Sequence, residues 1–212
     1  MHQEFIKRIL SSIILIPLVT FFIITGGIIF NLFILACLII SFYEWYSVSK
    51  NKKYHIFGYL FLLLSFFAAY KLISFDGDNK HFIFVLLICI LTDIGGYIFG
   101  KIFKGPKISK ISPNKTYSGM IGSLSFSILI ILIIINFSDL FTNLNTTFIN
   151  LILLTIIISI ISQIGDFTIS YFKRLSKIKN SGNLIPGHGG LLDRIDGSIF
   201  ALPLGFIIIS LL

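Results

Sequence analysis

The chain has 212 residues, of which 56% are hydrophobic and only 12% are charged, with a mean hydropathy of +0.97 and a formal net charge of +8. Soluble domains carry about a quarter charged residues, so this composition excludes an ordinary soluble protein and indicates a membrane protein. The basic residues lie in short clusters between apolar runs, which argues against nucleic-acid binding and favours a membrane protein with one positively charged side.

Seven apolar runs are candidates for transmembrane helices, each of which needs about 20 apolar residues. They cover residues 9–25, 28–46, 55–74, 82–100, 118–137, 147–165 and 198–212. The first two runs are nearly continuous, but one helix from Ile9 to Tyr43 would be about 52 Å long, so a tight turn at Gly26-Gly27 is predicted. The predicted fold is therefore all-α: a polytopic integral membrane protein with about seven transmembrane helices, forming a single domain over residues 1–212.

The distribution of basic residues predicts the orientation. All but two of the 17 basic residues, Lys71 and Lys80, fall on one side of the predicted spans. By the positive-inside rule, the N-terminus and the two long loops, 101–117 and 166–197, are cytoplasmic and the C-terminus is external. We therefore expect the active site in these loops, on the cytoplasmic side.

Acidic residues at membrane depth are candidates for a site. Asp93 lies within the fourth predicted span, beside Gly95 and Gly96. Such a carboxylate is costly, so it is either a structural hydrogen-bonding group between helices or part of a polar site. The glycines permit close approach of another helix or of a ligand. Glu44, beside Trp45 at the end of the second span, fits an interfacial anchor and a site role equally well.

Further carboxylates lie near the last two spans. Asp166 ends the sixth span, and Asp193 and Asp196 come directly before the seventh. Residues three apart share one face of a helix, so Asp193 and Asp196 are predicted to point at one site. Carboxylates among many lysines and arginines suit a hard cation such as Mg²⁺ that bridges phosphate oxygens. The alternative is an Asp–Arg salt-bridge cluster that closes a helix bundle.

The segment between these carboxylates has the pattern of a basic amphipathic helix. Apolar residues recur at spacings of three and four from Ile164 to Ile178. The segment is either an interfacial helix held by anionic lipid or a source of charge that neutralises a nucleotide or lipid phosphate. Its basic residues are Lys173, Arg174, Lys177 and Lys179.

A glycine-rich sequence, Pro186-Gly187-His188-Gly189-Gly190, follows this helix. Glycines such as Gly189 and Gly190 let backbone N–H groups approach phosphate oxygens and form anion-binding concavities. A lone histidine is usually structural. Between glycines and just before Asp193-Arg194, however, His188 is a candidate for a phosphate site.

The other long cytoplasmic loop is also basic and rich in turn residues. It offers Ser112, Lys115 and Thr116 as further substrate-binding candidates. The signal is weak by itself, because any cytoplasmic loop of a membrane protein is rich in lysine.

From Ser170 to Asp196 the chain reads S-x-F-K-R-x4-K-x5-I-P-G-H-G-G-x2-D-R-x-D. This long pattern resembles the signature of the phosphatidate cytidylyltransferase family, also called CDP-diacylglycerol synthases. Shorter family-like pieces occur in the same order along the chain: KRILSSIILIPLV near the N-terminus, Glu44-Trp45, D-x-G-G-Y-x2-G-K from Asp93, S-P-x-K-T from Ser112 and S-Q-x-G-D from Ser162. The resemblance therefore covers essentially the whole chain.

The resemblance implies transfer of CMP from CTP to phosphatidic acid, giving CDP-diacylglycerol and pyrophosphate, in phospholipid biosynthesis at a bacterial-type inner membrane. It implies Mg²⁺ bound by Asp166 and Asp193, and leaves open help from a monovalent cation and pairing as a homodimer. The implied catalytic residues are Asp166, Lys173, Arg174, His188, Asp193, Arg194 and Asp196. The implied substrate-binding residues are Asp93, Ser112, Lys115, Thr116, Gly189 and Gly190.

The chain departs from the family pattern at three positions. Asn180 replaces an aspartate, and Ile169 and Ser118 replace residues that are glutamate in many members. A degenerate, inactive homologue is therefore one alternative. The others are a membrane enzyme that transfers phosphate from CTP to a lipid alcohol, and a transporter whose Asp93 and Asp166 line an ion path.

Overall fold

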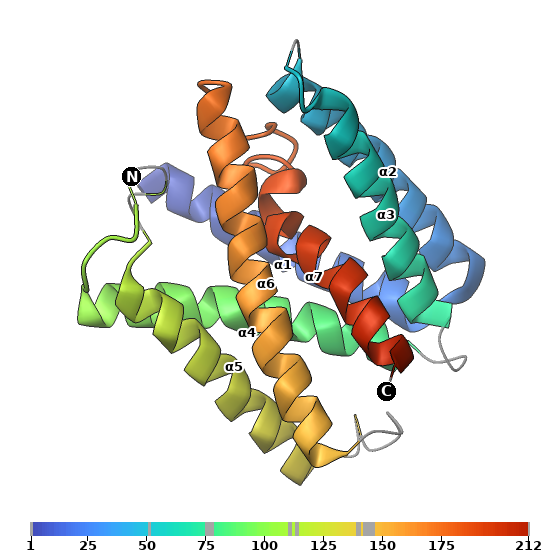
Figure 1. The fold of residues 1–212 in the computed structure, drawn as a ribbon. Coiled ribbons are helices and arrows are strands. Elements are labelled where there is room, and N and C mark those ends of the chain that lie inside the picture. Colours follow the sequence, from blue (N-terminus) through green and yellow to red (C-terminus); the bar gives the residue numbers. More distant parts are fainter. Residues whose placement is uncertain are drawn as a thin grey trace. The chain divides into compact units, whose positions relative to one another are not determined.

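The computed structural model describes residues 2–50, 52–74, 79–109, 112, 115–138, 141 and 147–211, with side chains at 10, 11 and from 13 onward. These residues form helices and contain no strand, which confirms the all-α prediction (Figure 1). The helices are α1 (His2–Thr25), α2 (Gly27–Ser49), α3 (His55–Ser74), α4 (Lys80–Phe103), α5 (Tyr117–Phe137), α6 (Phe148–Leu175) and α7 (Leu192–Leu211).

Six of the described helices, α2 to α7, are long and apolar enough to cross a membrane. Their number and length confirm that the chain is an integral membrane protein. In α1 the apolar stretch found is shorter, Ile13–Thr25, so the span predicted at residues 9–25 stays a prediction.

The predicted turn between the first two spans is confirmed. α1 ends at Thr25 and α2 begins at Gly27, with φ angles of 58° at Gly26 and 55° at Gly27. Side chains with a Cβ rarely adopt this left-handed region, so glycine permits the reversal without strain. The rings of Phe22 and Phe33 stack across the turn at 4.4 Å between centroids.

Two helix boundaries differ from the sequence prediction. α6 continues to Leu175, so Asp166 lies inside the helix rather than at its end. α7 begins at Leu192, so Asp193 and Asp196 lie in its first turns rather than before it. An apolar run ends at the first charged residue, but the hydrogen bonding of the helix can continue past it, as it does in α6. In α7, a carboxylate in the first turn is favourable because it interacts with the positive end of the helix dipole.

The chain divides into two compact units, and both α6 and α7 contribute to each. Unit 1 comprises Met1–Tyr70 and Phe172–Ile195, and unit 2 comprises Lys71–Tyr171 and Asp196–Leu212. Unit 1 therefore contains the glycine-rich sequence, and unit 2 contains the loop that joins α4 to α5.

Trp45 lies in the core of unit 1, where α2 and α3 run side by side (Figure 1). Its indole packs over Gly58 and meets the ring of Phe172 edge-on at 5.6 Å between centroids. Its Nε1–H donates to the backbone oxygen of His55 at 3.0 Å. Trp45 therefore has a buried packing role. Its neighbour Glu44, for which an interfacial anchor and a site role were both open, is buried as well.

Close packing of α4 on α5 organises unit 2 (Figure 1). A Cβ atom on Gly95 would lie 2.7 Å from Cβ of Phe126, and one on Gly119 would lie 2.8 Å from the backbone oxygen of Gly96. Small residues let helix backbones approach in a membrane. The glycines beside Asp93 thus serve helix packing.

A polar cluster joins three helices of unit 2. The hydroxyl of Thr92 on α4 lies 3.1 Å from that of Ser127 on α5 and donates to that of Ser159 on α6 at 2.9 Å. All three side chains are buried. Interhelical hydrogen bonds in membranes contribute about 0.6 kcal/mol each, so the cluster fixes the register of these helices more than it stabilises them.

Candidate active site

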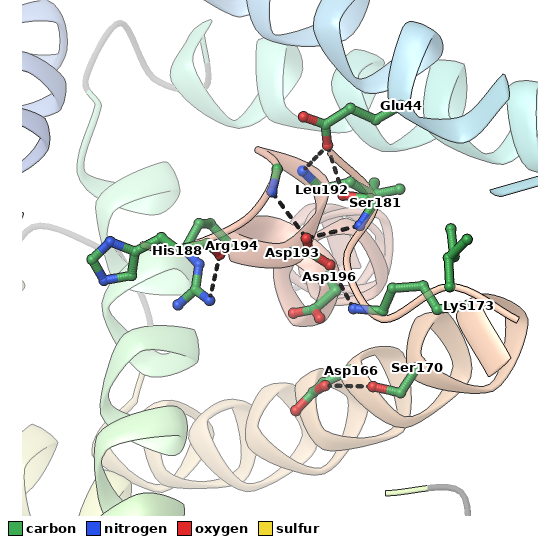
Figure 2. Close-up of polar contacts among 12 residues, drawn as sticks. Glu44, Asp166, Ser170, Lys173, Ser181, His188, Leu192, Asp193, Arg194 and Asp196 are labelled. Atoms are coloured by element: carbon green, nitrogen blue, oxygen red, sulfur yellow. Dashed lines mark hydrogen bonds and ion pairs between the residues drawn. The ribbon is translucent and has the colours of Figure 1, made fainter. Parts of the chain in front are cut away.

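The glycine loop, residues 181–191, is held to α2 by the buried carboxylate of Glu44 (Figure 2). This carboxylate accepts hydrogen bonds from the Ser181 hydroxyl and from the backbone N–H groups of Leu191 and Leu192, each at 2.8 Å. The two N–H groups belong to the start of α7, where a negative charge is stabilised by the helix dipole. Glu44 therefore fixes the loop at both of its ends.

Asp193 is a second carboxylate that holds the glycine loop (Figure 2). Its Oδ2 accepts from the backbone N–H groups of Ser181 and Gly190, both at 2.9 Å, and its Oδ1 accepts from Lys173 Nζ at 2.7 Å. The side chains of Lys173 and Asp193 are only 8% and 6% exposed. Lys173 thus neutralises a buried carboxylate, which would be costly to leave unpaired.

The glycines of the loop have specific steric roles. Gly189 has a φ angle of +90°, and a Cβ on Gly190 would overlap the Glu44 carboxylate. Their backbone N–H groups donate to the Ile185 oxygen and to Asp193, respectively. The glycines thus allow a tight turn and the close approach of two protein carboxylates. The predicted contact between their N–H groups and a phosphate stays a prediction.

Histidine and arginine side chains extend from this anchored region. His188 Nδ1 lies 2.6 Å from the Ser11 hydroxyl of α1, and Arg194 Nη2 donates to the His188 backbone oxygen at 3.0 Å. The exposed guanidinium of Arg174 donates to the Ile178 oxygen at 3.2 Å. A guanidinium has five N–H donors, so both arginines can direct further donors to an anion.

Unit 2 brings two other predicted site residues together. Lys115, at the end of the α4–α5 loop, forms an ion pair with Asp166 of α6. The Ser170 hydroxyl also donates to Asp166 Oδ1, at 3.4 Å (Figure 2). Both partners of the ion pair are 27% exposed, so Asp166 is far more accessible than Asp193.

The remaining residues of the α4–α5 loop have local structural contacts. Thr116 is the N-cap of α5, and its hydroxyl accepts from the Gly119 N–H at 3.1 Å. The backbone oxygen of Ser112 accepts from the Lys115 N–H at 3.1 Å. Ser118, one of the departures from the family pattern, lies 3.0 Å from the Thr116 hydroxyl. The loop thereby positions Lys115.

The other two predicted site carboxylates of unit 2, Asp196 and Asp93, have different environments. Asp196 is buried on α7, and its Oδ1 accepts from the Gly197 N–H at 3.0 Å. There α6 comes close to α7, because a Cβ on Gly165 would lie 2.9 Å from the Asp196 backbone oxygen. Asp93 is exposed on α4. The expectation that Asp193 and Asp196 point at one site stays a prediction.

A metal ion would find different conditions at the two predicted ligands. No three carboxylate, imidazole or thiolate side chains gather into a ready-made metal site in the described part of the chain. Mg²⁺ does not need such a cage, since it keeps several waters and often binds one or two carboxylates plus substrate phosphates. The accessible Asp166 fits this mode, whereas Asp193 would first have to release Lys173.

Sequence reasoning left the role of Glu44 open and did not single out Ser11. Both contact residues more than 130 positions away in the chain, so no local spacing could reveal the contacts. The available signal was the composition of FYEWY, a carboxylate beside a tryptophan at the end of an apolar run.

The sequence matches the profile of the Cytidylyltransferase family over residues 6–77 and 72–212. The chain belongs to this family. Similar proteins include the phosphatidate cytidylyltransferases of Staphylococcus haemolyticus, Staphylococcus epidermidis and Staphylococcus saprophyticus, at 41%, 39% and 38% identity over 167 residues. The match covers 75% of this chain and 62% of each relative, so the chain spans less than two thirds of the length of these relatives. The family resemblance of the motifs is thereby confirmed.

Proposed function

We propose that the chain transfers CMP from CTP to phosphatidic acid, giving CDP-diacylglycerol and pyrophosphate for phospholipid biosynthesis. Membership of the cytidylyltransferase family and the names of the relatives support this activity. The observation that carries the proposal is the anchored glycine loop, in which two buried carboxylates fix a segment that bears His188 and leads directly to Arg194 of α7. Such a preorganised cationic segment suits phosphate groups, whose charge must be met without rearrangement.

The proposed reaction joins two anions. An oxygen of the phosphatidic acid phosphate forms a bond to the α-phosphorus of CTP, and the bond to the β-phosphate breaks, so that pyrophosphate leaves with the electron pair. The attacking phosphate is already ionised, so no protein base is required. Cationic groups must offset the repulsion, and we assign this role to Arg174 and Arg194, whose guanidinium groups are exposed.

The other residues of unit 1 act through the loop. Lys173 forms an ion pair with Asp193, which in turn accepts hydrogen bonds from the backbone of the loop, so we assign both residues a positioning role. His188, oriented by Ser11, would shape the pocket for the nucleotide phosphates. Together they would keep in place the His188 backbone oxygen that accepts from Arg194.

Unit 2 offers the proposed carboxylate for Mg²⁺. When bound, Mg²⁺ would supply neutralisation of phosphate charge and in-line alignment of the attacking and leaving oxygens. Asp166 would hold it, and Lys115 would then be released to contact phosphate. Asp93 and Asp196 are retained as proposed site carboxylates, and the cluster of basic residues supports a cytoplasmic site that soluble CTP can reach.

Product analysis tests this proposal. The purified chain in vesicles is given phosphatidic acid, Mg²⁺ and CTP labelled either at the α-phosphorus or at the γ-phosphorus. We expect only the α-label in the lipid extract, with loss of the signal in Arg194→Gln and in EDTA but not in the matched variant Lys177→Gln. Label from the γ-phosphorus would identify a kinase, and no lipid label from correctly inserted protein would overturn the proposal.

A further inference from the structure

A cationic hollow lies at the turn between α2 and α3 in unit 1. It has a volume of about 420 Å³ and is lined by Tyr46, Lys50, Lys52, Lys53, His55 and Ile56. Binding sites for small ligands commonly have volumes of about 300–1,000 Å³. We call this feature the lysine hollow.

Among the described residues, no carboxylate compensates the charge of the lysine hollow. Lys50, Lys52 and Lys53 are exposed, and no carboxylate in the described ranges forms an ion pair with any of them. Lys50 Nζ lies 5.6 Å from the centre of the Tyr46 ring, a cation–π contact that holds the ammonium at the rim. Like charges this close repel one another, so a bound anion would relieve the repulsion.

The floor of the lysine hollow is rigid. The Ser49 hydroxyl donates its only proton to the Trp45 oxygen at 2.6 Å, so the 2.7 Å contact between Ser49 and His55 requires Nδ1–H of His55 as the donor. This bond fixes the orientation of the imidazole. The first turn of α3 begins at His55 and adds the positive end of a helix dipole.

The lysine hollow lies where a lipid headgroup is expected. α2 and α3 are both candidate membrane spans, and the hollow is at the ends that face the lysine-rich turn. Beside it, Ile56 and Phe57 are 68% and 74% exposed, as expected of side chains that contact acyl chains. Amines next to exposed apolar groups at a helix end match an amphiphile with an anionic head better than a soluble anion.

The lysine hollow is separate from the glycine loop. Glu44 and Ser47 of α2 both contact Ser181, whereas Tyr46, which lines the hollow, projects from the side of α2 away from Glu44. No residue that lines the hollow belongs to the glycine loop. A ligand in the hollow would therefore not occupy the anchored loop.

We propose that the lysine hollow binds the phosphate group of an anionic membrane lipid as a site additional to the proposed active site. The phosphate accepts from the ammonium groups of Lys50, Lys52 and Lys53, and the acyl chains lie along Ile56 and Phe57. This binding does not depend on the proposed CMP transfer, because it involves none of the residues assigned to that reaction.

Native mass spectrometry of the intact protein, released from vesicles of phosphatidylglycerol and phosphatidylcholine, tests this site. The test variant is Lys50→Gln/Lys52→Gln/Lys53→Gln. The control is Lys101→Gln/Lys104→Gln/Lys107→Gln, which removes the same charge from the last turn of α4 and the loop that follows it. We expect retained phosphatidylglycerol to fall at least about tenfold in the test variant only, as each lysine near a membrane contributes substantially to anionic lipid binding.

Three outcomes would overturn the proposal. One is an equal loss of phosphatidylglycerol in both triple variants, which would indicate general attraction to membrane charge. Another is unchanged retention in the test variant. The third is full displacement of the lipid by millimolar inorganic phosphate, which would identify a site for soluble phosphate. None of these readouts requires nucleotide turnover, so failure of this site and failure of the proposed function are distinguishable.

Discussion

Replacing Glu44 by glutamine should release the glycine loop although the side chain keeps its size. Glutamine has one oxygen, and its amide nitrogen is a donor. If this nitrogen takes the place of Oε1, the Leu191 N–H loses its acceptor, and if it takes the place of Oε2, the Leu192 N–H loses its acceptor. Ser181 can rotate its hydroxyl, but a backbone N–H cannot turn.

The magnitude follows from these contacts. An unsatisfied buried donor costs about 1–3 kcal/mol, and loss of a negative charge at a helix N-terminus costs about 0.3–2 kcal/mol more. Local opening should therefore become easier by about 2–4 kcal/mol, which corresponds to roughly 30-fold to 1,000-fold. Hydrogen exchange at Leu191 and Leu192, measured by mass spectrometry in lipid nanodiscs, reports this opening.

Matched variants separate the loop from the rest of the fold. Ser181→Ala removes one hydroxyl donor and leaves both backbone bonds of Glu44, so its exchange should rise far less than in Glu44→Gln. Exchange within α4 and α5 should stay as in the unmodified chain. If Glu44→Gln inserts and folds but exchange at the loop is unchanged, the reasoning about the carboxylate is refuted.

Further predictions concern the neighbours of this carboxylate and the two ion pairs. Gly190→Ala should loosen the loop, because its Cβ would overlap the Glu44 carboxylate. In the Glu44→Ala background the same substitution should cost less free energy of loop closure, and a double-mutant cycle of exchange rates must show this coupling. Lys173→Met should lower the free energy of unfolding by about 3–5 kcal/mol, because it leaves the buried Asp193 carboxylate without its ion-pair partner. Adding Asp193→Asn should recover part of the melting temperature, and the absence of any recovery would contradict the pairing. Lys115→Gln should change the free energy of unfolding by less than about 1 kcal/mol, because its ion pair with Asp166 is accessible to solvent, but it should raise KM for CTP. A fall in melting temperature as large as that of Lys173→Met would contradict this difference between the two ion pairs.

The fold could be predicted from the sequence because the bilayer imposes the length of each helix. The span at residues 55–74 has the bounds of α3, and the turn at Gly26 is present as predicted. The predicted C-terminal end of α6 and the predicted start of α7 were wrong by up to ten residues. Hydropathy falls at the first charged side chain, but α6 continues past this point to Leu175, and α7 begins before it at Leu192.

The site could be predicted only in part. The motif located the chemistry-bearing residues, including Asp166, Lys173 and Asp193, but it did not specify which charge is buried and which is accessible. That difference arises from tertiary contacts: Asp193 lies against backbone N–H groups and Lys173, whereas Asp166 meets Lys115 at the surface. The contact of Glu44 with the loop depends on residues distant in the chain, which a pattern in one sequence does not encode.

The central claim is that the chain moves CMP from CTP onto a phospholipid. The most direct measurement is the stoichiometry of products from the purified chain in vesicles of defined phosphatidic acid, with mass spectrometry of the lipid extract and an assay of released pyrophosphate. The account predicts one CDP-diacylglycerol, with the acyl chains of the added phosphatidic acid, for each pyrophosphate. Release of CDP without pyrophosphate, or consumption of CTP without any cytidine-containing lipid, would contradict it.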